Sequence, residues 1–162
     1  MAAVKSFRDL NVYQSARKSA QTLFELTKTF PAEERYALTD QIRRSSRAIK
    51  AMIAQAWARR RYKAAFINKI DEALGESNET QSSLDVCYDC LYISADQFRE
   101  LDDAFASIGA MLARMIDRAD DFCRYPPSTD YRSHQPRVTE EAGVYADAAL
   151  AEFFNQSLIT NH

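Results

Sequence analysis

The side chains that most often carry catalysis are scarce in this sequence. Its only histidines are His134 and His162, and both lie in the last quarter of the chain. This nearly excludes a histidine-based triad, a zinc site with histidine ligands and a histidine general base in the folded body. With only three glycines, the chain also contains no glycine-rich loop that would bind phosphate. We therefore expect no catalytic residues and no cofactor.

Two small clusters do have residue types that are found in metal or redox sites. Cys87 and Cys90 have C-x-x-C spacing, but two thiols are too few for a closed zinc site. They also fall near a predicted helix end, whereas a reactive thiolate is stabilised at a helix start. Glu72, Glu76 and Glu79 share one helical face, without the Glu-x-x-His motif of di-iron bundles. We interpret the cysteines as packing residues and the glutamates as a solvated or interface face, and an enzyme or metal protein is the least favoured alternative.

Charge is distributed unevenly along the chain, although the net charge is only −2. Residues 35–69 include ten Lys or Arg and one acid, and residues 71–103 include ten Asp or Glu and one Arg. The candidate nucleic-acid-binding residues are Arg43, Arg44, Arg47, Lys50, Arg59, Arg60, Arg61 and Lys63. Arginine binds phosphate bidentately, and the nearby Trp57 and Tyr62 are aromatic rings on which bases stack. Alternatively, the two segments neutralise each other, within one chain or between subunits.

Apolar residues at spacings of three and four predict four helices. The predicted helices cover residues 10 to 29, 32 or 33 to 58, 62 to 91, and 94 to 122. The fourth has a sustained heptad repeat, which is typical of left-handed bundle packing, and Ser94 and Gln97 form a capping-box pattern at its start. Gly75 falls inside the third helix, where we expect a close contact with another helix. The sequence thus predicts an all-α protein, an antiparallel up-down four-helix bundle with a C-terminal extension.

The chain changes character after Cys123. We assign residues 1–123 to the bundle and residues 124–162 to an extension, which consists of a polar linker and a short helix from about Thr139 to Leu158. No apolar run is long enough to cross a membrane, and no signal peptide is evident at the start. An odd number of scattered cysteines is typical of reduced thiols, so we expect a cytoplasmic protein without a membrane partner.

Several short stretches of the chain form a recognisable series: FRDLNVYQ at 7–14, TKTFPAEERYALT at 27–39, QIRRSS at 41–46, ALGE at 73–76, ET at 79–80 and YI at 92–93. In order and spacing, these stretches resemble the bacterial four-helix-bundle family of 23S rRNA-intervening sequence proteins. The resemblance extends over some 115 residues, from Phe7 to about Phe122. One departure is Gln55-Ala56 near the end of the second helix, where the family usually has Glu-Gly.

This resemblance implies an up-down bundle that assembles as a ring, commonly a homopentamer, with no known enzymatic activity. A related branch, the accessory proteins of diversity-generating retroelements, uses a similar basic pentamer to bind nucleic acid and a reverse transcriptase. Our leading hypothesis is therefore a non-enzymatic, ring-forming scaffold or interaction module. The alternative is a nucleic-acid-binding accessory protein, which uses its basic face to bind RNA or DNA, with a reverse transcriptase or ribosomal RNA as partner.

Overall fold

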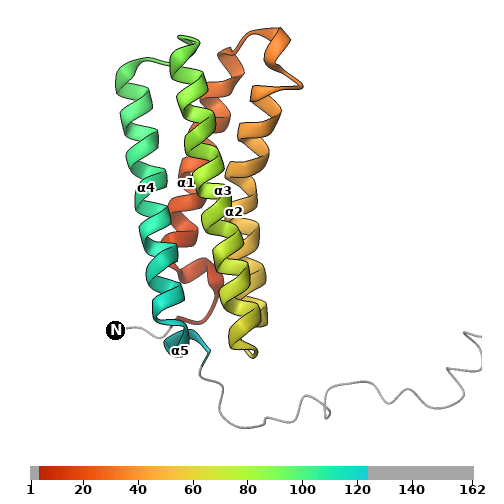
Figure 1. Cartoon of the computed structure of the whole chain (residues 1–162), viewed down its shortest axis with the longest axis vertical. Coiled ribbons are helices and arrows are strands. Elements are labelled where there is room, and N and C mark those ends of the chain that lie inside the picture. The colour runs from red at the N-terminus through yellow and green to blue at the C-terminus, as the bar shows by residue number, and fades with distance from the viewer. Residues whose placement is uncertain (1–3, 124–162) are drawn as a thin grey trace, which may run out of the picture. The chain divides into compact units, whose positions relative to one another are not determined.

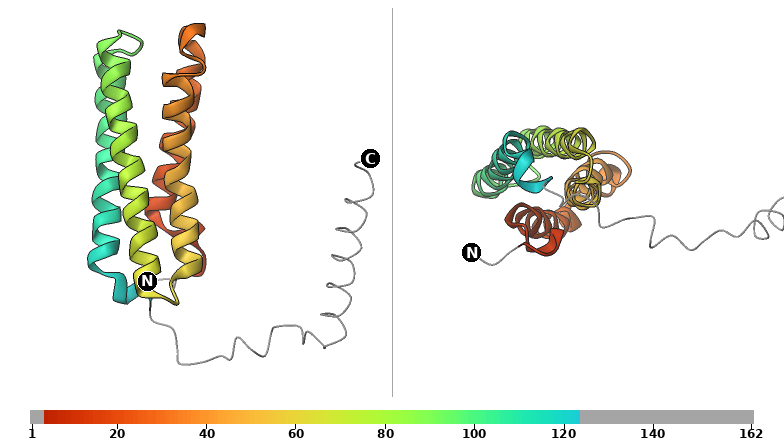
Figure 2. Two further views of the ribbon diagram at one scale, coloured as in Figure 1. Left: turned by 45° about the vertical axis from the view of Figure 1, so that its right-hand side comes forward. Right: turned by 90° about the horizontal axis from the view of Figure 1, so that it is seen from below.

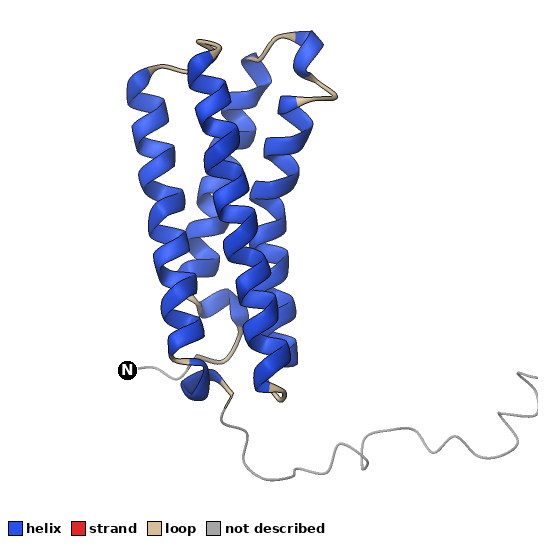
Figure 3. Ribbon diagram, viewed as in Figure 1, coloured by secondary structure: helices blue, strands red, loops and turns tan. Residues whose placement is uncertain are grey.

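A computed structural model describes residues 4–123, and this part of the chain folds as an all-helical bundle (Figures 1 and 3). Its long helices are α1 (Asn11–Leu26), α2 (Leu38–Arg59), α3 (Lys63–Asp89) and α4 (Ala95–Asp117). Each runs antiparallel to the next, and α1 and α4 also pack together. The up-down four-helix bundle predicted from the apolar spacing is thus confirmed.

Several short helical turns lie between or beside the long helices. They are the 3-10 turns η1 (Phe7–Asp9), η2 (Thr27–Thr29) and η3 (Ala32–Glu34), and the one-turn helix α5 (Ala119–Phe122). The prediction of one continuous helix from 94 to 122 was wrong at its end, because the non-helical backbone of Arg118 separates α4 from α5.

The predicted start of the second helix was also wrong. Residues 32–34 form η3, and α2 begins only at Leu38, because Ala37 has a non-helical backbone with φ −119° and ψ −108°. The Glu34 carboxylate accepts the Leu38 N–H at 3.3 Å and the Tyr92 hydroxyl at 3.1 Å. Glu34 therefore satisfies a free N–H at the start of α2 and ties this loop to the α3–α4 loop.

Most residues that the apolar spacing predicted are in the core, but Tyr13, Phe98 and Phe122 are only partly buried, and two further residues depart from the prediction. Ile42, Ile49, Phe66 and Phe105 are fully buried, among others. Leu91, predicted to continue the core stripe of the third helix, is instead 86% exposed. The seam of α2 passes through Ile53, which is fully buried, whereas the predicted seam residue Met52 is only half-buried.

The two helical glycines of the described residues differ in their surroundings. A Cβ added at Gly75 would have no other atom within 4 Å, so the close helix contact expected there does not exist. A Cβ at Gly109 would lie 3.3 Å from Cδ1 of Leu74, so α3 and α4 approach closely at Gly109. The predicted capping box at the start of α4 is present, with Gln97 N–H donating to Ser94 Oγ at 3.2 Å and Ser94 N–H to Gln97 Oε1 at 2.9 Å.

No helix in residues 4–123 is long and apolar enough to span a membrane. The predicted extension, including the helix expected between Thr139 and Leu158, lies outside the described residues.

Candidate interaction surfaces

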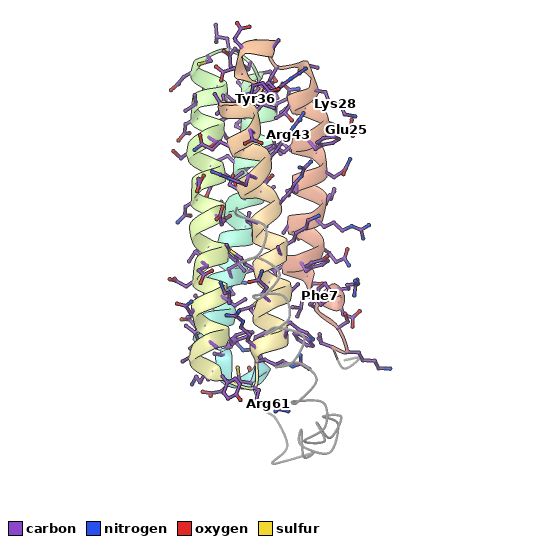
Figure 4. All side chains as sticks on the ribbon, turned by 90° about the vertical axis from the view of Figure 1, so that its right-hand side faces the viewer. Phe7, Glu25, Lys28, Tyr36, Arg43 and Arg61 are labelled. Atoms are coloured by element: carbon purple, nitrogen blue, oxygen red, sulfur yellow. The ribbon has the colours of Figure 1, made fainter. Side chains whose placement is uncertain are left out.

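A groove between α1 and α2 combines basic side chains from both helices. Its volume is about 710 Å³, and its charged lining residues are Arg17, Lys18, Glu25, Arg47 and Lys50. Arg17 and Lys18 are adjacent in α1, and Arg47 and Lys50 lie one turn apart in α2, so each helix supplies one basic wall. We call this feature the α1/α2 groove. Figure 4 looks onto this side of the bundle.

The aromatic ring of Phe24 contacts basic side chains at one end of the groove. Phe24 is half-buried in α1, and its ring centroid lies 4.8 Å from Cζ of Arg43, 5.3 Å from Cζ of Arg47 and 4.9 Å from Nζ of Lys28. Arg43 also donates from Nε to Thr27 Oγ1 at 2.8 Å. Cations over an aromatic face are held electrostatically, so the arginine side chains of α2 are fixed against α1.

The groove carries an uncompensated positive charge. Glu25 is the one acid that lines it, and its carboxylate pairs with Lys28 at 2.6 Å and accepts from Gln21 at 3.0 Å. Within residues 4–123, no carboxylate forms an ion pair with any of the four basic lining residues. A concave surface with one sign of charge concentrates its potential, so the groove attracts anions.

The predicted basic residues do not form one cluster in the structure, because they lie on different sides of α2 and at its end. Arg43, Arg47 and Lys50 lie on the α1 side of α2, whereas the charge of Arg44 acts on Glu76 of α3. Burial and the neighbouring Glu79 raise the pKa of Glu76, and Arg44 opposes this shift. The sequence analysis missed Arg17 and Lys18, because two adjacent charges in α1 do not form a charge run.

The remaining predicted basic residues lie at the α2–α3 turn. They begin nine residues beyond Lys50, which is about 14 Å along a helix. Arg60 lies 4.0 Å over the Trp57 ring and donates to the Trp57 carbonyl at 2.7 Å. Lys63 forms an ion pair with Asp120 at 2.9 Å. Figure 4 places Arg61 at this end of the bundle.

Opposite charges collect on opposite sides of the bundle. Helices α1 and α2 together carry seven basic and two acidic residues, a net charge of +5, whereas α3 and α4 carry four basic and eleven acidic residues, a net charge of −7. The end-on view in Figure 2 shows α1 and α2 on one side and α3 and α4 on the other. Lys69 and Glu72 form an ion pair between segments 35–69 and 71–103.

The two cysteines of the C-x-x-C pair differ in exposure. Cys87 is fully buried and Cys90 is exposed. Burial, followed by the nearby Cys90, raises the pKa of the Cys87 thiol to about 12. Cys87 is therefore protonated at neutral pH and packs as a small apolar residue. No group of three or more metal-ligating side chains occurs within the part of the chain that the structure describes.

The described residues form a four-helix bundle, and its candidate interaction surfaces are charged. The family of 23S rRNA-intervening sequence proteins matches residues 8–114. This is well over half of the chain, so the chain belongs to that family, as its sequence motifs predicted.

A solved structure agrees with this assignment. It is the crystal structure of a protein of unknown function from the S23 ribosomal protein family of Bacteroides thetaiotaomicron. The two sequences are 28% identical, the match covers 65% of this chain and 95% of the other, and the TM-score is 0.59. Comparison with curated proteins gives no match. The family relationship therefore defines the fold without assigning a biochemical activity.

Proposed function

We propose that this protein is a non-enzymatic helical module that assembles with copies of itself into a ring and acts as a scaffold or interaction partner. The observation that carries the proposal is the segregation of charge, +5 on α1 and α2 against −7 on α3 and α4. Complementary potentials favour contact between the basic side of one copy and the acidic side of the next. Repeated head-to-tail contacts form a ring where the rotation closes. The family resemblance implies five subunits.

A non-enzymatic role is supported by the composition of the bundle. Residues 4–123 contain no histidine, so no histidine-based triad or general base can form within them. The cysteines Cys87, Cys90 and Cys123 are free, which suits the cytoplasmic location that we propose.

Light scattering over a range of protein concentrations tests this proposal. At low salt and micromolar concentration, we expect a mass that is a multiple of the 18.5 kDa chain. A mass of one chain across the whole concentration range would contradict the proposed self-assembly.

A second candidate function is binding of RNA or DNA at the α2–α3 turn. Arg59 and Arg61 are exposed there beside Tyr62, which is itself 67% exposed. A ring would repeat this surface in every subunit, and repeated weak sites raise the overall affinity. The family name mentions 23S rRNA, which makes ribosomal RNA one partner to test. A reverse transcriptase is the protein partner that the related branch suggests.

This second candidate is tested by titrating labelled single-stranded and duplex RNA and DNA at low and physiological salt. Replacing Arg59 and Arg61 with glutamine should weaken binding and make the log–log salt dependence shallower by about 0.7 to 0.9 for each phosphate that the protein no longer neutralises. Arg35→Gln/Arg99→Gln, which removes two positive charges at exposed positions of the opposite end of the bundle, is the matched control. Absence of binding by the unmodified protein at low salt would exclude this function.

A further inference from the structure

We propose that the α1/α2 groove receives the acidic α3/α4 surface of a second copy of this chain, centred on Asp85 and Asp103. This inference rests on the self-assembly proposed above and goes beyond it by naming the two surfaces that meet. It also predicts that every copy uses both surfaces, one toward each neighbour.

The groove has the dimensions and the charge to hold a protein surface. Along α1 its lining extends from Gln14 to Glu25, which corresponds to about 16 Å of helix. Arg17 on one wall and Lys50 on the other have no ion-pair partner within residues 4–123. Exposed carboxylates that enter from outside would supply the missing negative charge.

The groove is also organised before any partner binds. Phe24 and Thr27 of α1 hold Arg43 of α2, and the same ring holds Arg47. A binding surface whose side chains are already fixed loses less conformational entropy on association. Since the Phe24 ring is in contact with cations, it does not offer a bare face on which a nucleic-acid base could stack.

The complementary surface occurs on the same chain. Asp85 of α3 and Asp103 of α4 are exposed, and neither forms an ion pair within the described residues. Gln81 donates from Nε2 to Asp102 Oδ1 at 2.7 Å, which links α3 and α4 in this region. These helices lie on the far side of the bundle from the groove (Figure 2), so one copy cannot fill its own groove with them. The net charge of −7 on α3 and α4 also disfavours a polyanionic ligand on that side of the bundle.

Charge reversal tests the pairing directly. The groove variant Arg17→Glu/Lys50→Glu should weaken assembly on the order of 100-fold, because like charges then face each other. The surface variant Asp85→Lys/Asp103→Lys should weaken it to a similar extent. The chain with all four substitutions has an acidic groove and a basic α3/α4 surface, and we expect its assembled mass to return toward that of the unmodified protein. Light scattering measures each mass, and circular dichroism confirms that each variant is helical.

The control variant is Arg35→Glu/Arg114→Glu, which changes the net charge as much as the groove variant does but at exposed positions that do not line the groove. It should assemble as the unmodified protein does. If the unmodified protein assembles and the groove variant keeps its full mass, this inference is overturned while self-assembly stands. Loss of RNA binding by the groove variant without a change in mass would assign the groove to nucleic acid instead. Failure of the fourfold variant to regain mass would also overturn the pairing, whereas a monomeric unmodified protein would refute self-assembly itself.

Discussion

Replacing Leu91 with glycine should stabilise this protein. Leu91 follows the end of α3 and has a φ of 60°, the left-handed conformation that L-residues other than glycine avoid. Its N–H donates to the Tyr88 carbonyl at 2.9 Å, and the next N–H, of Tyr92, donates to the Cys87 carbonyl at 2.9 Å. This is the Schellman arrangement, in which the left-handed position is usually glycine.

The expected gain follows from two opposing effects. A left-handed L-residue costs about 1–2 kcal/mol relative to a relaxed backbone, and glycine removes that cost. Glycine also increases the entropy of the unfolded chain, which costs about 0.4–1 kcal/mol. Little burial is sacrificed, because Leu91 is already 86% exposed. The net stabilisation is about 0.5–1 kcal/mol, which corresponds to a Tm increase of about 2–4 °C for a folded body of this size.

Denaturant and thermal unfolding at one fixed protein concentration measure this difference, since assembly makes Tm depend on concentration. Leu91→Ala is the control, because alanine keeps the Cβ that makes the conformation costly. We expect no comparable gain for alanine. A glycine variant that is no more stable than the unmodified protein would refute the argument from backbone strain.

Further predictions concern the other glycines and the cysteines. Gly75→Ala should stabilise the bundle by about 0.5–1 kcal/mol. Gly109→Ala should gain less stability or lose some, because its Cβ would lie 3.3 Å from Leu74. The urea unfolding midpoints of the two variants measure this difference. In the native protein a thiol reagent should modify the exposed Cys90 and leave Cys87 unmodified until unfolding, which mass spectrometry of the labelled chain detects. Because the Cys87 pKa is raised from 9.0 to about 12, its contribution to stability is fully present below pH 9 and is lost as the pH rises toward 12. The unfolding free energy should therefore decrease over that range relative to a Cys87→Ala variant, and equal pH dependence of the two proteins would contradict this.

The architecture was predictable because it depends on a repeated pattern. The heptad spacing of residues such as Leu101, Phe105, Ile108 and Leu112 determines which face of α4 is buried, and all four are core residues. A pattern of this length outweighs local irregularities. The capping box of α4 was predictable for a similar reason, because it involves only residues three apart in sequence.

The predictions for the start of α2 and for the surroundings of Gly75 failed because both depend on contacts distant in sequence. The start of α2 depends on Glu34, whose carboxylate also accepts the hydroxyl of Tyr92 from another loop. The space around Gly75 depends on where neighbouring helices lie. The α1/α2 groove was not foreseen, because its walls come from two helices and become neighbours only after the chain folds back. Even so, the basic character of α2 was evident from its charge run.

The dependence of the assembled mass on salt tests the central claim most directly. Surface charges separated by a few ångströms are strongly screened in 1 M salt, where the Debye length is about 3 Å. We predict that light scattering at micromolar protein gives a multiple of the 18.5 kDa chain at low salt and a substantially lower mass in 1 M sodium chloride. An assembly whose mass is the same at both salt concentrations would show that apolar contacts hold it together and would contradict the electrostatic pairing of the two faces.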